Sequence, residues 1–206
     1  MFYIVDDFYP NPDEIREYAL SQHFNKGRIF NIKTKMKTIM HPGARTKRSL
    51  DMENHIYLRN RIEKIVNQPI MNWYSEGTFN GVFNLGIGDK EPNWIHTDLV
   101  EARRELQESQ NYKLWAGVVY LTPNAPLNGG TSLYMYKDGT RVVGKNTILK
   151  DKEITSPNWV QHATAKNIYN RLVLYRGDHY HAPDRAGFGH NRETGRLTQL
   201  IVFMTQ

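Results

Sequence analysis

Three short segments of this 206-residue chain carry side chains that could do chemistry. Each segment holds two polar residues separated by one other residue: His96 and Asp98, His179 and His181, and Arg196 and Thr198. Two histidines and one carboxylate on one face of a metal, with positions left open, are the ligand set of non-haem Fe(II) oxygenases. An arginine with a hydroxyl two residues later can clamp a carboxylate. If the three segments converge, the chain is an oxidising enzyme.

The first segment, His96-Thr97-Asp98, supplies an imidazole and a carboxylate. On a strand, residues i and i+2 point the same way, so both side chains can meet one ion. Such a triplet also arises by chance in a chain with 8 histidines, a risk that any short motif carries. Asp98 could instead cap a helix formed by Leu99–Tyr112. The segment therefore indicates a metal site only together with the other two segments.

The second segment, His179-Tyr180-His181, follows the apolar run Leu172–Tyr175. If that strand continues, both imidazoles fall on one face, so one would be a ligand and the other its neighbour. Asp178 could orient a ring N–H or simply make the turn. The competing interpretation is that both histidines lie on the surface.

The third segment places Arg196 at the head of a strongly apolar run that continues to Phe203. A guanidinium that enters such a core needs an anionic partner, because a lone buried charge is very costly. A dicarboxylate cosubstrate would supply that partner, and Thr198 on the same face could donate its hydroxyl. The alternative is an internal salt bridge to an aspartate or glutamate.

The elements that must position these residues are mostly short strands. Runs rich in β-branched and aromatic residues, separated by Gly, Pro and Asn, predict an antiparallel sandwich or jelly roll. The expected strands are Phe79–Ile87, Trp94–Thr97, Leu114–Leu121, Thr131–Tyr136, Val142–Val143, Asn158–Gln161, Ile168–Arg176 and Leu197–Met204. Between them, Leu99–Tyr112 is expected to be a solvated helix or an insertion loop.

Helices are predicted only near the N-terminus, where Phe2–Val5 forms a first short strand. Asn11 can cap a helix that begins at Pro12, and a second helix runs from about Asp51 to about Pro69. We therefore expect one domain over residues 1–206, in which a helical part, 1–77, packs on a jelly-roll core, 78–206.

Composition restricts the function classes. The chain has no cysteine, which excludes disulfide scaffolds and Cys-ligated zinc. We expect neither a signal peptide nor a membrane span, and a cytoplasmic location. Eight of the basic residues, and no acidic one, fall in 26–50, where His41-Pro42-Gly43 reads as a turn. This stretch is either a solvated surface or a site for an anionic partner such as nucleic acid or an acidic peptide.

The three segments, in this order, resemble the Fe(II)/2-oxoglutarate-dependent dioxygenases of the prolyl-4-hydroxylase-like branch. The family pattern is His-x-Asp, a distant His, and an Arg or Lys about one strand later, which here matches His96, Asp98, His181 and Arg196. Four other stretches resemble a bacterial and phage subgroup of unassigned substrate: Asn11-Pro12-Asp13, Pro42-Gly43-Ala44-Arg45-Thr46, Leu127-Asn128-Gly129-Gly130-Thr131-Ser132 and Arg176-Gly177-Asp178. The subgroup pattern Gly-Asp-x-x-His favours His181, with His179 as the alternative distal ligand.

The resemblance, which covers essentially the whole chain, implies a double-stranded β-helix (jelly roll). It also implies Fe(II) on His96, Asp98 and His181, and 2-oxoglutarate on Arg196 and Thr198. With O2, and with ascorbate as a supporting reductant, such an enzyme hydroxylates a C–H bond and releases succinate and CO2. The substrate, whether peptide, small molecule or nucleobase, does not follow from it.

Two other functions stay open at this point. One is a cupin-type metal-binding jelly roll that uses His96 and His181 without 2-oxoglutarate. The other is a non-enzymatic module that binds an anionic partner through residues 26–50, whose affinity would fall steeply with salt.

Overall fold

A computed structural model describes residues 2–31, 36–47, 52–73, 80–98, 108, 110–142 and 151–206, without the side chains of 27–31, 36–40, 52 and 53. The helices are α1 (Pro12–Ser21), α2 (Met52–Val66) and the 3-10 turn η1 (Leu127–Gly129). The strands are β1 (Phe2–Val5), β2 (Phe24–Asn31), β3 (Met36–Thr46), β4 (Ile70–Trp73), β5 (Phe83–Gly86), β6 (Lys113–Tyr120), β7 (Thr131–Tyr136), β8 (Trp159–Ala165), β9 (Leu172–Arg176), β10 (His181–Pro183) and β11 (Arg196–Thr205).

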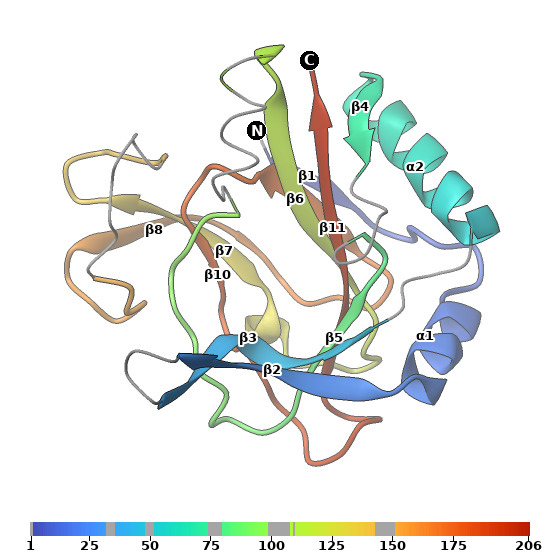
Figure 1. Cartoon of the computed structure of the whole chain (residues 1–206), viewed down its shortest axis with the longest axis horizontal. Helices are drawn as coiled ribbons and strands as arrows, with labels where there is room; N and C mark the ends of the chain where they lie inside the picture. Colours follow the sequence, from blue (N-terminus) through green and yellow to red (C-terminus); the bar gives the residue numbers. More distant parts are fainter. Residues whose placement is uncertain are drawn as a thin grey trace.

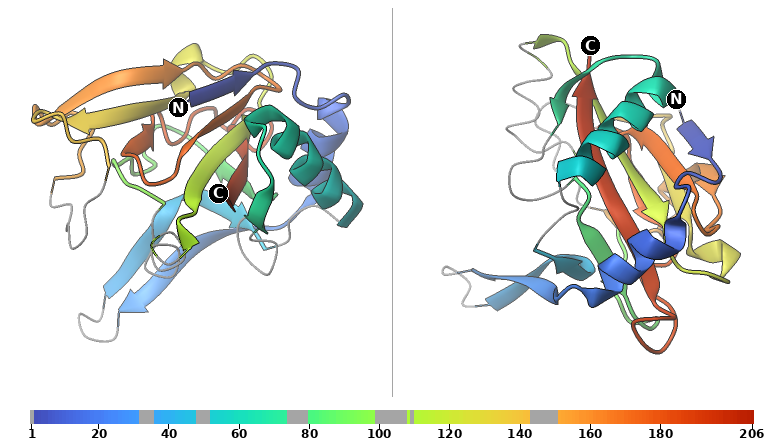
Figure 2. Two further views of the ribbon diagram at one scale, coloured as in Figure 1. Left: turned by 90° about the horizontal axis from the view of Figure 1, so that it is seen from above. Right: turned by 90° about the vertical axis from the view of Figure 1, so that its right-hand side faces the viewer.

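The strands form two antiparallel sheets. The large sheet has the order β1-β9-β6-β11-β5-β3-β2, with β4 paired to one end of β11, and the small sheet has the order β10-β7-β8. Both helices cover the outer side of the large sheet, and the small sheet lies on its other side (Figure 1; Figure 2). The described part of the chain is therefore mainly β, as predicted.

The side chains of β6 and β11 alternate between two sides of the large sheet, one covered by the helices and one facing the small sheet. Residues of one parity, such as Trp115, Ile201 and Phe203, pack with Leu58 and Ile62 of α2. Residues of the other parity face the space between the sheets, where Val118 joins a second buried cluster. Because successive strand side chains point to opposite faces, one strand can hold the helices on one side and shape a cavity on the other.

The N-terminal part differs from the sequence expectation. Residues 1–77 supply the two predicted helices but also four strands of the large sheet, of which only β1 was predicted. His41-Pro42-Gly43 is not a turn but lies inside β3, where Gly43 adopts a φ of +73°. A glycine in this conformation makes an irregularity in a strand rather than ending it. Asn11 is the residue before α1, but its side chain makes no capping hydrogen bond.

Other predicted elements had mixed outcomes. Strands β6, β7, β9 and β11 lie where they were expected, and β7 has the predicted bounds. Trp94–Thr97 forms no strand, although His96 makes an isolated bridge to His181. Most of Leu99–Tyr112 lies outside the described residues. Neither α1 nor α2, the α-helices that the structure describes, has the length and apolar character needed to cross a membrane.

A bidentate ion pair joins the neighbouring ends of β1 and β9. Arg171 Nε lies 2.6 Å from Asp6 Oδ1, and Nη2 lies 2.9 Å from Oδ2. This hydrogen-bonded guanidinium lowers the pKa of the Asp6 carboxyl. Because the folded-state pKa is the lower one, the pair stabilises the fold above the unfolded-state pKa of about 3.9, and this contribution is lost as the pH falls through the folded-state pKa.

We therefore expect Asp6→Asn to reduce the free energy of unfolding at pH 7 by about 0.5–1 kcal/mol, a small effect because the Asp6 side chain is 56% exposed and screened by water. Urea unfolding at pH 7 and at about pH 2 checks it, since both proteins should be equally stable in acid. An equal deficit at the two pH values would mean that the pair is not the cause.

Candidate metal centre

Backbone pairing brings the first two predicted segments together. His96 N–H donates to the His181 carbonyl at 3.0 Å, and His181 N–H donates to the His96 carbonyl at 2.9 Å. Two residues later, Asp98 N–H donates to the carbonyl of Gly177 at 2.8 Å. These bonds place segment 96–98 beside the start of β10, so residues far apart in sequence present their side chains at one point.

The side chains of His96, Asp98 and His181 form a compact group. Each offers one ligand atom, and these atoms all lie within 4.8 Å of one another. His181 Nε2 is 3.3 Å from Asp98 Oδ2, and the two imidazole rings are 4.4 Å apart between centroids. His181 is almost fully buried, whereas the Asp98 side chain is 29% exposed. The group is therefore positioned at the wall of a cavity rather than sealed in the core.

Hydrogen bonds set the tautomer of both histidines. His96 Nδ1 lies 3.1 Å from the Trp94 carbonyl, and His181 Nδ1 lies 2.9 Å from the His179 carbonyl. A carbonyl only accepts, so each Nδ1 carries the proton and each Nε2 presents a lone pair. Burial, reinforced by the neighbouring His181, lowers the pKa of His96 to about 4, so its imidazole is neutral at pH 7. Neutral imidazole is the form that binds a metal.

Of the two late histidines, only His181 belongs to this group. His179 precedes β10 and makes an isolated bridge with Val142. Its contribution to the site is its backbone carbonyl, which holds the His181 ring. The hypothesis that Asp178 orients a ring N–H is not needed for His181, because the carbonyl does so. Asp178 pairs with Arg176 at 2.7 Å.

The third segment lies on β11 and faces the same space. Arg196 is 4% exposed, and its Nε and Nη2 donate to the carbonyls of Gly129 and Gly130 at 3.0 and 3.3 Å. Its guanidinium lies over the Tyr120 ring, 5.7 Å from the centroid. Burial lowers the pKa of Arg196. Within the described ranges no carboxylate forms an ion pair with Arg196, so the internal salt bridge considered above is not found there.

Thr198 follows on the same face of β11. It is fully buried, and its Oγ1 has no hydrogen-bond partner among the residues that the structure describes. A buried hydroxyl without a partner costs free energy. Arg196 and Thr198 thus present a positive charge and an unused hydroxyl to the same space, which suits an incoming carboxylate.

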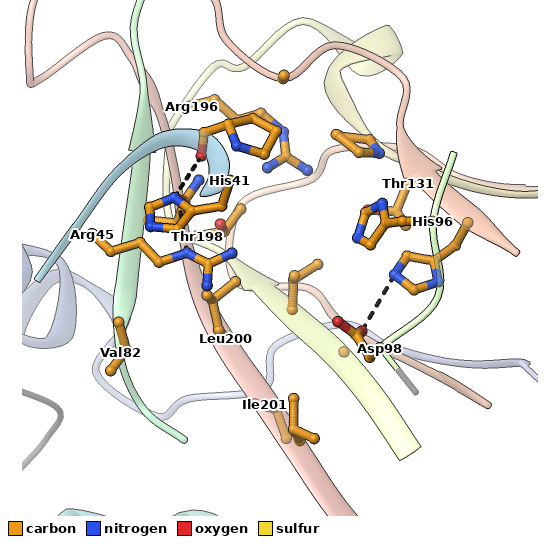
Figure 3. A pocket seen from close by; sticks show the side chains of 18 of the residues that line it. His41, Arg45, Val82, His96, Asp98, Thr131, Arg196, Thr198, Leu200 and Ile201 are labelled. Atoms are coloured by element: carbon orange, nitrogen blue, oxygen red, sulfur yellow. Dashed lines mark hydrogen bonds and ion pairs between the residues drawn. The ribbon is translucent and has the colours of Figure 1, made fainter. Parts of the chain in front are cut away.

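That space is a cavity of about 520 Å³ between the sheets. Figure 3 shows His96 and Asp98 on one side of it and Arg45 and His41 on the other. The described residues that line it are His41, Pro42, Arg45, Thr46, Lys47, Val82, Asn84, Trp94, His96, Thr97, Asp98, Gly117, Val118, Thr131, Tyr175, His181, Pro183, Ala186, Arg196, Thr198, Leu200, Ile201 and Val202.

Sequence reasoning missed the part of this lining that comes from β3 and β5. In the sequence, Arg45 stands out only as part of the basic stretch and of the motif Pro42–Thr46, and nothing singles out Asn84. In contrast, the aromatic residues Trp115 and Tyr134 pack in buried clusters away from the lining. The motif was the only signal in the sequence that could have indicated Arg45.

Comparisons with known proteins give similarity in structure alone. No family model matches the sequence, and no curated protein matches it either. A prolyl hydroxylase from Trichoplax adhaerens, in complex with a peptide of the hypoxia inducible factor oxygen degradation domain, has a TM-score of 0.55 at 13% identity, covering 99% of this chain and 83% of that one.

Two further solved structures are similar over the whole chain. A Pseudomonas putida prolyl-4-hydroxylase has a TM-score of 0.51 at 15% identity, covering 100% of this chain and 92% of its own. HygX from Streptomyces hygroscopicus, with nickel and 2-oxoglutarate bound, has a TM-score of 0.56 at 13% identity, covering 99% and 82%. The chain therefore has the fold of these proteins, and the predicted double-stranded β-helix is confirmed.

Proposed function

We propose that this chain is an Fe(II)- and 2-oxoglutarate-dependent oxygenase that hydroxylates a C–H bond. One observation carries the proposal. Two imidazole Nε2 atoms and a carboxylate meet at the wall of a cavity that also contains a buried arginine, which has no carboxylate partner among the described residues. Burying the ligand group and the guanidinium costs free energy unless each has a partner. Iron would be the partner of the ligand group, and 2-oxoglutarate would be the partner of the guanidinium.

The donor set fits ferrous iron. His96 and His181 would each bind through Nε2 and Asp98 through a carboxylate oxygen, which leaves positions open for other ligands. The carbonyls of Trp94 and His179 hold the two rings in the required tautomer. His179 is proposed as a backbone support for His181, not as the alternative ligand.

The far wall fits the distal carboxylate of 2-oxoglutarate. Arg196 would provide the charge and Thr198 a hydrogen bond from its otherwise unused hydroxyl. The carbonyls of Gly129 and Gly130 accept two of the guanidinium N–H groups and so fix its orientation.

When bound, iron and 2-oxoglutarate supply the oxidation of a C–H bond by O2, with release of succinate and CO2. The chain would position the iron and the 2-oxoglutarate and shield them from water. Val118 and Leu200 line the cavity with apolar groups, and the buried Tyr175 ring lies 4.6 Å from that of His181. Such a lining limits water near the open metal positions.

The substrate class stays open at this level. Two proteins with the same fold are described with a hypoxia inducible factor peptide and with hygromycin B, so the fold accepts very different molecules. A small molecule or a segment of a peptide would each fit a cavity of about 520 Å³.

The competing functions gain less support. A cupin-type site without 2-oxoglutarate leaves Arg196 and Thr198 with no role. The binding module would use the basic residues 26–50, but most of their side chains lie outside the described residues, so no described contact supports an anionic partner there.

The direct test is turnover by the purified wild-type chain. With Fe(II), ascorbate and O2, we expect consumption of 2-oxoglutarate and equimolar release of succinate, slow without substrate and abolished by chelation of the metal. If the metal-loaded protein neither turns over nor binds 2-oxoglutarate, the result favours the cupin-type alternative.

A further inference from the structure

One buried tyrosine in the cavity wall has a hydroxyl that no other residue satisfies within the described part of the chain. Tyr175 lies near the end of β9, directly opposite Ala116 of β6. Its side chain lines the cavity although it is only 4% exposed, and its hydroxyl makes no hydrogen bond to a described residue. A buried tyrosine hydroxyl usually finds a partner, and burying one without a partner costs free energy.

Two other buried tyrosines show the usual arrangement. Tyr9 donates its hydroxyl to Gln199 Oε1 at 2.6 Å, and Tyr120 donates its hydroxyl to Thr131 Oγ1 at 2.8 Å. A phenylalanine would fill the position of Tyr175 with the same ring and without this cost. The hydroxyl of Tyr175 is therefore better explained by a ligand in the cavity than by packing.

The surroundings of Tyr175 place its hydroxyl near the metal centre. The centroid of its ring lies 4.6 Å from that of His181 and 6.4 Å from that of Phe2, so ring contacts on two sides restrict its orientation. Burial, followed by the charge of Asp98, raises the pKa of the hydroxyl well above its ordinary value, and the charge of Arg196 opposes this rise. The hydroxyl is thus a donor at pH 7, and both charged groups are close enough to act on it.

Bound 2-oxoglutarate would bring acceptors for this donor to both ends of the space. The distal carboxylate is already assigned to Arg196 and Thr198. The other end, a keto group next to a carboxylate, would bind the iron beside His181, whose ring the Tyr175 ring contacts. A phenol O–H can donate to a keto or a carboxylate oxygen, so the end nearer to Tyr175 offers a suitable acceptor.

We propose that the Tyr175 hydroxyl donates a hydrogen bond to the keto-acid end of 2-oxoglutarate, the end that binds the iron. This inference rests on the proposed function. Tyr175 is then a third residue that binds the cosubstrate, and it acts at the opposite end of the molecule from Arg196 and Thr198. Its hydrogen bond would hold the keto acid in one orientation on the metal.

The first test is calorimetry of 2-oxoglutarate binding to the full chain loaded with Mn(II), which allows binding without turnover. Tyr175→Phe removes only the hydroxyl and keeps the ring against His181. We expect the Kd of 2-oxoglutarate to rise about three- to tenfold, as the loss of one hydrogen bond does. The Kd of Mn(II) should not change, because Tyr175 is not a proposed ligand.

Thermal unfolding of the metal-free protein distinguishes a ligand contact from a structural one. Because the hydroxyl has no described partner there, Tyr175→Phe should be at least as stable as wild type. Tyr9→Phe is the matched control, since it removes a buried hydroxyl that is hydrogen-bonded to Gln199. It should lower the midpoint of unfolding and leave the Kd of 2-oxoglutarate unchanged.

A double variant shows which end of 2-oxoglutarate the hydroxyl contacts. If Tyr175 and Arg196 hold opposite ends, the factors by which Tyr175→Phe and Arg196→Ala raise the Kd should multiply in the double variant, as expected for independent contacts. If they hold the same carboxylate, the effect of Tyr175→Phe should largely disappear once Arg196 is replaced.

Three results would overturn the inference: an unchanged 2-oxoglutarate Kd in Tyr175→Phe, a metal-free Tyr175→Phe protein that is less stable than wild type, or an effect of Tyr175→Phe that disappears in the Arg196→Ala background. Failure of the proposed function is seen separately, because 2-oxoglutarate binding to the Mn(II)-loaded wild type is measured before any variant.

Discussion

Replacement of His181 by alanine will weaken Fe(II) or Mn(II) binding at least about 100-fold. Loss of a group that merely orients a ligand typically costs about 10–100-fold in affinity, and loss of the ligand itself costs more. His181 is buried, its Nδ1 is held by a carbonyl and its Nε2 is 3.3 Å from Asp98. Metal titration of the apoprotein by calorimetry gives the Kd directly.

His179→Ala is the matched control for this experiment. It removes an imidazole two residues away but keeps the backbone carbonyl that holds the His181 ring. The variant should bind metal within about twofold of wild type, because it removes no ligand. If the two variants exchanged these results, His179 would be the distal ligand and the geometry described here would be wrong.

Arg196→Ala will raise the Kd and the apparent KM for 2-oxoglutarate at least about tenfold, since hydrogen bonds to a charged group contribute about 1.5–3 kcal/mol. The guanidinium is nearly fully buried beside the unused hydroxyl of Thr198. Calorimetry of 2-oxoglutarate binding to the Mn(II)-loaded variant measures the effect apart from turnover.

Two controls distinguish the loss of the contact with 2-oxoglutarate from a general defect in folding. Metal affinity should be unchanged in Arg196→Ala, because Arg196 is not among the proposed ligands. Arg196→Lys retains a charge and should lose less affinity for 2-oxoglutarate than alanine does. An unaltered 2-oxoglutarate Kd in a folded Arg196→Ala protein would show that the clamp lies elsewhere.

Three of the strands that the sequence predicts well have a continuous apolar character. Strands β6, β9 and β11 combine β-branched and aromatic residues in runs that fit a sheet buried on both faces. Strand β3 was missed because Pro42 and Gly43 normally indicate a turn. Its extended form depends on the hairpin with β2, and also on pairing with β5 and on the bond from Gly43 to Glu91. The last two are contacts between residues far apart in the sequence.

The candidate site, like the fold, could be predicted only in part from the sequence. The i, i+2 spacing of His96 and Asp98 could be read from the sequence. The family resemblance favours His181 over His179, but the spacing of the residues alone leaves that choice open. It depends on the three-residue strand β10 and its pairing with β7 and His96. Arg45 could not be assigned either, because its place in the cavity follows from the position of β3 beside β5.

A crystal structure of the Mn(II)-loaded chain with 2-oxoglutarate, prepared without oxygen, would show where this chain holds the metal and the cosubstrate. We expect one anomalous metal peak coordinated by the Nε2 atoms of His96 and His181 and by Asp98, with the distal carboxylate of 2-oxoglutarate on Arg196 and Thr198. A metal bound elsewhere, or a saturating 2-oxoglutarate concentration that leaves Arg196 without a carboxylate, would contradict it.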